Sequence, residues 1–134
     1  MLSIAGLALV ALGGAIGGMA RFWVGALVGR RFGDTFPWGT LVVNVTGAAS
    51  IGVLAAIFLD REAHAVTSIP LWAWLVAGTL GSYTTVSSFS LQTLALLRSG
   101  ETMSAALNIV ASLALCLTAA AATYIATLFW LGAL

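Results

Sequence analysis

One apolar run of this chain is interrupted by the stretch Gly78-Thr79-Leu80-Gly81-Ser82-Tyr83-Thr84-Thr85-Val86-Ser87-Ser88-Phe89-Ser90. Seven of these thirteen residues are Ser or Thr, and none is charged. Because apolar residues flank it on both sides, we expect the stretch to lie at bilayer depth. Backbone there must satisfy its own hydrogen bonds, and a break is tolerated only where protein or a water-filled path surrounds it. A broken, hydroxyl-rich helix indicates an ion or solute site; the alternative is an intact helix whose hydroxyls bond back to its own carbonyls.

The composition is that of an integral membrane protein. Of the 134 residues, 61% are hydrophobic and 7% are charged, and the mean hydropathy is +1.11. About a quarter of the residues of a soluble domain are charged, so that class is excluded. The net charge is +1 without a basic run, which excludes nucleic-acid binding, because phosphate contacts need clustered Lys or Arg. The short loops leave no room for a catalytic domain, so we do not expect an enzyme.

Four apolar runs reach the length of about 20 residues that a membrane-crossing helix needs. We therefore predict an all-α membrane protein with one domain over residues 1–134 and four transmembrane helices, at about 2–29, 38–59, 69–97 (broken mid-membrane near 78–85) and 103–132. The first run lacks a charged n-region, so we expect a retained helix rather than a signal peptide. The loops are short, which makes consecutive spans antiparallel neighbours and places both termini on one side.

The distribution of Arg weakly specifies the orientation. Arg30, Arg31 and Arg98 lie in the first and third loops, whereas the second loop has only Arg61. Positive residues favour the cytoplasmic side, so the bias favours a cytoplasmic location for the first and third loops. An excess of two charges is small, and insertion in both orientations stays open.

The charged residues of the spans favour an anion over a cation. Arg21 lies within the first apolar run, and an intramembrane Arg is a functional-site hypothesis by default. Its place late in that helix also permits snorkelling to the interface. None of the four runs contains Asp or Glu, and a proton-coupled exporter of cations needs such an acid. Uncharged donors together with an Arg suit a small anion.

Several uncharged polar residues of the spans have two interpretations. The Asn44 amide can form an interhelical hydrogen bond or donate to a passing anion. Asn108, Ser112 and Cys116 recur every four residues and share one helix face, which can line a path or hold helices together. Phe89 is an ordinary packing residue by itself, but an aromatic ring edge is electropositive and can face an anion.

Three motifs follow one another along the chain: Gly13-Gly14 with Gly17-Gly18 and then Arg21; Gly39-Thr40-Leu41 followed by Val43-Asn44 and Gly47; and Gly78-x-x-Gly81-x-x-Thr84-Thr85-x-Ser87-x-Phe89. With four spans and a broken third helix, they resemble the Fluc/CrcB family of small fluoride channels over nearly the whole chain. The resemblance implies passive fluoride efflux across the bacterial plasma (inner) membrane, which lowers cytoplasmic fluoride.

The resemblance also implies an antiparallel dimer with two narrow pores and a structural sodium ion at the dimer centre. By matching positions, the sodium ligands are the backbone carbonyls of Gly81 and Thr84. The residues implied for the anion pore are Asn44, Thr40, Phe89, Ser112, Ser87 and Arg21.

The chain departs from the family pattern at several positions. Val86 stands where the family has Phe, and Gln92 where Glu is usual. An ungapped comparison has Asn108 in place of Tyr, Cys116 in place of a pore Ser, and Ala120 in place of a pore Thr. These departures leave open a divergent homodimer or a half-pore, even non-conducting, subunit of a heterodimer with a paralogue. The remaining alternative, a small multidrug exporter, needs a membrane-embedded acid that the first helix lacks.

Overall fold

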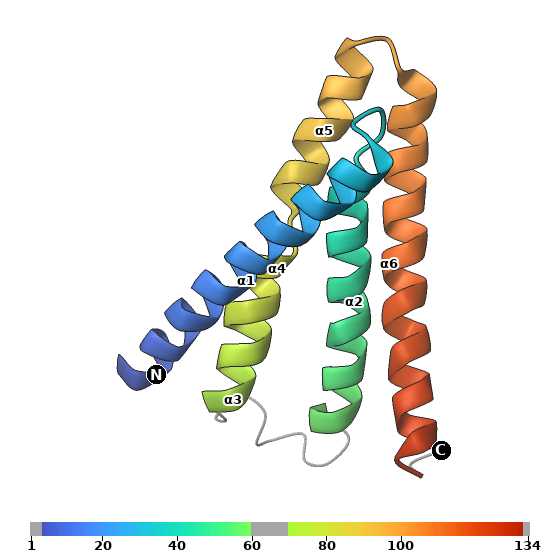
Figure 1. Cartoon of the computed structure of the whole chain (residues 1–134). Coiled ribbons are helices and arrows are strands. Elements are labelled where there is room, and N and C mark those ends of the chain that lie inside the picture. The colour runs from blue at the N-terminus through green and yellow to red at the C-terminus, as the bar shows by residue number, and fades with distance from the viewer. Residues whose placement is uncertain (1–3, 60–69, 133–134) are drawn as a thin grey trace.

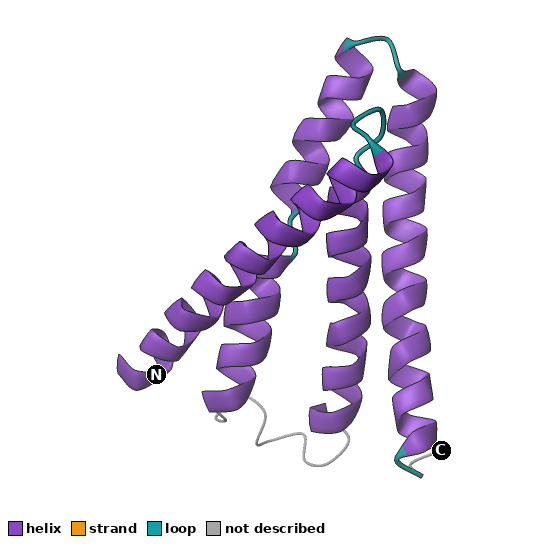
Figure 2. Cartoon of the chain, viewed as in Figure 1, coloured by secondary structure: helices purple, strands orange, loops and turns teal. Residues whose placement is uncertain are grey.

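The computed structural model describes residues 4–59 and 70–132, and within these two ranges all regular secondary structure is helical (Figure 2). The turn at Asp60-Arg61-Glu62, expected to close the second span, lies outside the described residues. The elements are, in chain order, α1 (Ile4–Phe32), α2 (Trp38–Leu59), α3 (Pro70–Trp72), the π-helix η1 (Ala73–Leu80), α4 (Gly81–Tyr83), α5 (Val86–Arg98) and α6 (Thr102–Trp130).

Three of these helices are long and apolar enough to cross a membrane. They are Ile4–Phe32, Trp38–Phe58 and Thr102–Trp130, judged by length and composition over the described residues. Large apolar side chains such as Phe22, Phe129 and Trp130 are exposed. So much exposed apolar surface is untenable in water and fits a lipid surrounding.

The helices form one bundle in which α2 and α6 lie side by side (Figure 1). These two helices share the most extensive interface, and α1 crosses the bundle obliquely and packs mainly on η1, with smaller contacts of similar extent to α2 and α4. The N-terminal end of α1 and the C-terminal end of α6 lie at the same end of the bundle (Figure 1). The connections at 33–37 and 99–101 lie toward the opposite end.

Glycines allow α1 to approach η1 backbone to backbone. A Cβ on Gly13 would lie 2.9 Å from the Thr79 backbone nitrogen, and one on Gly17 would overlap the Thr79 carbonyl. From the other side, a Cβ on Gly78 would lie 2.7 Å from the Val10 carbonyl oxygen. Small residues on facing surfaces permit this close approach where lipid supplies no hydrophobic drive. The Gly-rich run of the first span is therefore a packing surface.

The backbone leaves the helical conformation between α4 and α5. Thr84 has φ −78° and ψ 159°, and Thr85 has φ −153° and ψ 124°, so both residues are extended. Thr85 caps the N-terminus of α5, because its side-chain oxygen accepts a 3.2 Å hydrogen bond from the Ser88 N–H. Thr is among the residues that satisfy the free N–H groups at a helix start. The interruption is thus followed directly by a newly capped helix.

The turns before the interruption are also irregular. In η1 the helix is wider than an α-helix, and the Gly81 N–H donates to the Val76 carbonyl five residues earlier as well as to the Gly78 carbonyl. The Thr79 hydroxyl donates to the Trp74 carbonyl oxygen at 3.0 Å. Turns of π type are rare and are frequently found at functional sites. The path from η1 to α5 is therefore where a site is expected.

Candidate functional site: a groove beside the interruption

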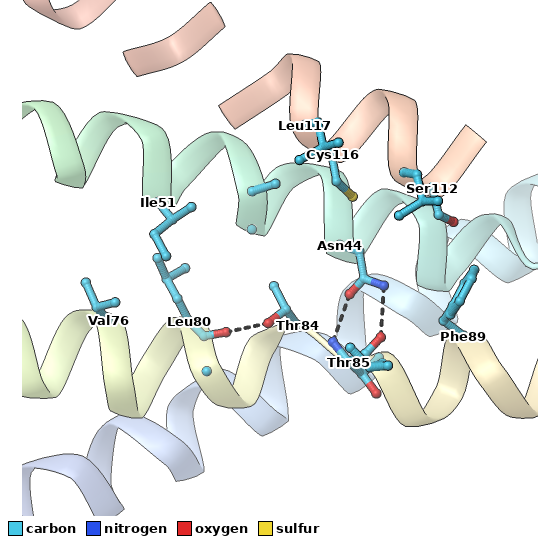
Figure 3. Close-up of a pocket in the computed structure, with 15 residues that line it drawn as sticks. Asn44, Ile51, Val76, Leu80, Thr84, Thr85, Phe89, Ser112, Cys116 and Leu117 are labelled. Carbon is cyan, nitrogen blue, oxygen red and sulfur yellow. Dashed lines mark hydrogen bonds between the residues drawn. The ribbon is translucent and has the colours of Figure 1, made fainter. Parts of the chain in front are cut away.

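An open groove of about 600 Å³ lies between α2, α6 and the segment from η1 to the first turns of α5 (Figure 3). Its wall is mainly apolar. Its polar members come from three separate parts of the chain and are Asn44, Thr84, Thr85, Ser112 and Cys116. Over residues 4–59 and 70–132, no carboxylate lines this groove. A mainly apolar cavity with a few convergent polar groups is the usual form of a binding site.

Asn44 binds the interruption through both ends of its amide. Its Nδ2 donates to the Thr85 carbonyl oxygen at 2.9 Å, and its Oδ1 accepts from the Thr85 N–H at 2.8 Å (Figure 3). An Asn amide has two donor hydrogens, so one remains for a further partner. Asn44 therefore links α2 to the extended backbone at Thr85 through two hydrogen bonds.

Arg21 reaches the same backbone from α1. Its Nη1 donates to the Thr84 carbonyl oxygen at 3.4 Å, a long bond in a half-buried setting. The distance lies outside the range of strong N–H···O bonds. A guanidinium at this place offsets the partial negative charge of a carbonyl that extended backbone has freed. Arg21 thus contacts the interruption rather than the wall of the groove.

The Gly81 and Thr84 carbonyl groups, which were expected to hold a cation, lack the N–H partners that they would have in a continuous helix. The Thr85 N–H, which would bond the Gly81 carbonyl in a continuous helix, donates to Asn44 instead. The Thr84 carbonyl accepts from Arg21. Backbone carbonyls of unwound helices suit a hard monovalent cation such as sodium, so the donor type fits. Within residues 4–59 and 70–132, Arg21 is the group that competes for the Thr84 oxygen.

Phe89 on α5, which follows Thr85, and Ser112 and Cys116 on α6 also line the groove (Figure 3). Phe89 is half-buried, and Ser112 is buried. No residue within the described ranges forms a hydrogen bond with the Ser112 hydroxyl, which leaves that hydrogen free to donate into the groove. The groove therefore contains a hydroxyl donor and an aromatic ring in addition to the amide of Asn44.

Besides Arg21, two other residues expected in the pore lie outside the groove. Thr40, one helical turn before Asn44 on α2, lines a smaller cavity of about 360 Å³ together with Asp34 and Gln92. Ser87 is exposed and does not line the groove; its Oγ lies 3.1 Å from the Thr85 Oγ1, within hydrogen-bond distance. The groove therefore unites Asn44 with the α5 and α6 residues, but not with these two hydroxyls.

The structure gives two threonines contacts that were not predicted from the sequence, although Thr85 lies within the Thr84 to Ser90 stretch whose backbone and hydroxyl groups were candidate donors. Thr85 is the partner of Asn44 and the cap of α5, and Thr93 accepts a buried hydrogen bond from Asn108. The preference of Thr for the position before a helix could have indicated the cap. Nothing in a single sequence indicates the Thr93 contact, because it joins two helices.

Together, the bundle and the groove define an all-helical membrane protein with uncharged polar groups gathered beside an interrupted segment. The family described as "CrcB-like protein, Camphor Resistance (CrcB)" matches residues 8–124. The chain therefore belongs to the CrcB-like family, as the three motifs indicated.

Proteins named fluoride-specific ion channels are similar to this chain over most of their length. The FluC 2 protein of Rhodopseudomonas palustris (strain BisB18) is 56% identical over 119 residues, covering 88% of this chain and 89% of the relative. The FluC 2 protein of Bradyrhizobium diazoefficiens is 47% identical over 116 residues, covering 87% and 84%. The FluC 3 protein of Brucella suis biovar 1 is 51% identical over 116 residues, covering 87% and 86%.

Proposed function

We propose that this protein is a fluoride-selective channel through which fluoride leaves the cytoplasm passively. The observation that carries the proposal is the groove, whose polar groups are an amide, hydroxyls and a thiol, with no carboxylate from the described residues. Such a wall donates hydrogen bonds to an anion without binding it by charge. The names of the relatives support fluoride as that anion. Hydrogen fluoride enters as a neutral molecule and ionises at the higher internal pH, and the anion then leaves down its gradient.

Fluoride holds its hydration shell tightly, so a selective path must replace water with fixed donors. The remaining Nδ2 hydrogen of Asn44 and the Ser112 hydroxyl are the donors of this groove. The electropositive edge of the Phe89 ring supplies a third favourable contact and excludes water. Because Thr85 holds the Asn44 amide at both ends, the free hydrogen has one direction and needs no reorganisation.

In the bacterial plasma membrane, the segment Pro70–Arg98 would form the third of four spans, in addition to the three long helices. Its interruption at Thr84 and Thr85 would lie mid-membrane. Extended backbone at that depth requires surrounding protein. Asn44 on α2 and Arg21 on α1 donate hydrogen bonds to this backbone. Its polar groups thus have partners within the protein, as they need at bilayer depth.

The proposed assembly is a dimer of antiparallel subunits with a structural sodium ion between them. The Gly81 and Thr84 carbonyls of one chain are too few for a complete cation site, so a second subunit would supply further oxygens. That subunit is a second copy of this chain or a paralogue. The departures at Val86 and Cys116, and the numbered names of the relatives, make the paralogue worth testing.

Purified protein in liposomes loaded with potassium fluoride is expected to release fluoride when valinomycin is added. Valinomycin lets potassium leave with the fluoride, so no membrane potential builds up to stop the efflux. A fluoride electrode measures the release, and liposomes loaded with potassium chloride and read with a chloride electrode are the selectivity control. If the chain alone is silent, the same assay is repeated after co-expression with a family paralogue from the same genome. Absence of fluoride release in both preparations would refute the channel proposal.

Replacing Val86 with Phe is expected to raise fluoride efflux severalfold at little cost in stability. The Val86 side chain is 77% exposed at the edge of the groove, so a ring has room there. Its edge would add a second electropositive contact for the anion. Leu91→Phe is the matched control, since Leu91 is 69% exposed on the same helix and does not line the groove. Equal efflux in both variants would show that this side of the groove does not conduct.

A further inference from the structure

A buried hydrogen-bonded chain connects α6 to the backbone of Phe89. Asn108 is 2% exposed and Thr93 is 8% exposed. The Asn108 Nδ2 donates to the Thr93 Oγ1 at 2.9 Å. The Thr93 Oγ1 donates in turn to the Phe89 carbonyl oxygen at 2.7 Å. An amide and a hydroxyl that are both buried are costly unless they are paired, so each residue depends on the other.

The direction of this chain is determined by the chemistry of its groups. The Phe89 carbonyl can only accept, and a Thr hydroxyl has a single hydrogen to donate. Once that hydrogen points to Phe89, the Thr93 oxygen can only accept, so Asn108 must present its NH₂ group. Hydrogen bonds in series polarise one another in a medium of low dielectric constant. Replacement of either side chain therefore disturbs the whole series.

The series of hydrogen bonds ends at the backbone of Phe89, whose side chain lines the groove. Phe89 lies in the first turn of α5, directly after the extended backbone of Thr84 and Thr85. The Thr93 hydroxyl therefore bonds directly to the backbone of the residue whose ring lines the groove.

The other end of the series, Asn108 on α6, is next to a groove residue along its helix. Ser112 is one helical turn after Asn108 on the same face of α6, and it lines the groove together with Phe89 (Figure 3). A bond that joins α6 to α5 at Asn108 therefore determines how far the Ser112 hydroxyl lies from the Phe89 ring.

We propose that Asn108 and Thr93 are positioning residues that hold the Phe89 ring at its distance from the Ser112 hydroxyl. The role rests on the proposed fluoride channel, because it concerns two contacts of the same groove. It gives Asn108 and Ser112, two polar residues of one face of α6, different roles. Ser112 faces the groove as a donor, whereas Asn108 faces α5 and makes no contact with the anion.

The first test compares efflux with folding stability. Thr93→Val has the same shape but lacks the hydroxyl, and fluoride efflux is expected to fall severalfold because the Phe89 carbonyl and the Asn108 amide lose their shared partner. Thr93→Ser keeps the hydroxyl and is expected to retain efflux. The double variant Thr93→Val with Asn108→Leu removes both polar groups, so its thermal stability should recover while its efflux stays low. Recovery of efflux in the double variant would show a purely structural role and overturn the proposal.

The control removes a similar bond that does not join two helices. The Thr118 hydroxyl on α6 donates to the Ala114 carbonyl at 2.6 Å within its own helix. Thr118→Val is therefore expected to leave efflux unchanged. A fall in efflux as large as that of Thr93→Val would mean that loss of any such hydroxyl impairs the protein, and would also overturn the proposal.

A second readout does not depend on conduction. With 4-fluorophenylalanine incorporated at position 89 by amber suppression, one sharp ¹⁹F resonance is expected for the parent chain and for Thr93→Ser. Thr93→Val should shift or broaden it. If the parent chain releases no fluoride, the channel proposal fails, while the resonance still tests the positioning. An unchanged resonance and unchanged efflux in Thr93→Val would refute the positioning role alone.

Discussion

Asn44→Asp is expected to abolish most fluoride efflux. The carboxylate has the shape of the amide but cannot donate, so the Thr85 carbonyl loses its 2.9 Å hydrogen bond. Two acceptors then face each other, and leaving a buried group unsatisfied costs about 1–3 kcal/mol. A barrier to anion passage raised by the same amount lowers the rate by about tenfold to a hundredfold. The negative charge repels the anion as well, so we expect the upper end of this range in the liposome assay.

Asn44→Leu separates the two causes of that loss. It removes both hydrogen bonds to Thr85, one more than Asn44→Asp removes, but it adds no charge. Efflux is therefore expected to fall in both variants, and a deeper fall in Asn44→Asp measures the repulsion of the anion by the carboxylate. Circular dichroism and size-exclusion chromatography verify that both variants remain helical and assembled. Parent-like efflux from an assembled Asn44→Asp protein would exclude Asn44 from the anion path.

Gly17→Ala is expected to disrupt the packing of α1 on η1. The added methyl group would overlap the Thr79 carbonyl and lie 3.0 Å from the Tyr83 backbone nitrogen. Both neighbours are backbone atoms, which cannot swing aside as the end of a flexible side chain can. Overpacking of this kind costs about 1–3 kcal/mol. A lower unfolding temperature in detergent and reduced efflux are therefore expected, because the same shift displaces the turn before Thr84.

The adjacent glycine provides the matched control. A Cβ on Gly18 meets no heavy atom of the described residues within 4 Å, and Ala favours the helix over Gly by up to about 1 kcal/mol. Gly18→Ala is expected to unfold at the same temperature as the parent or slightly higher. If both variants unfold alike, the close approach of α1 to η1 is not a determinant of the fold.

The helices were largely predictable from local features of the sequence. The first run was expected to end at about residue 29, and α1 continues to Phe32. Gly33, with φ of +81°, ends it, because glycine readily adopts the left-handed conformation that closes many helices. The last helix was expected at about 103–132 and spans Thr102–Trp130. Bilayer thickness sets the required length of apolar runs, which explains why composition alone comes close.

The groove was only partly predictable. Asn44, Phe89 and Ser112 were expected at one site, and the structure gathers them there. Thr40 shares the helix of Asn44 but opens into the neighbouring cavity, and Ser87 is exposed. Helical periodicity places residues on a face, but it does not say which other helix that face meets.

The order of residues alone specifies a membrane protein of long apolar helices, an acid-free set of apolar runs and a hydroxyl-rich segment with a break near 78–85. The structure narrows the extended backbone to Thr84 and Thr85 and keeps residues 78–83 helical. The features that the sequence specifies follow from hydropathy, charge and local backbone preference, which act between near neighbours in the chain. The partners of the polar side chains depend on packing instead. Asn44 meets Thr85 across 41 positions of sequence, and Asn108 meets Thr93 only because α5 folds back along α6. Hydrogen bonds between separate helices depend on distances that exist only after the bundle has formed.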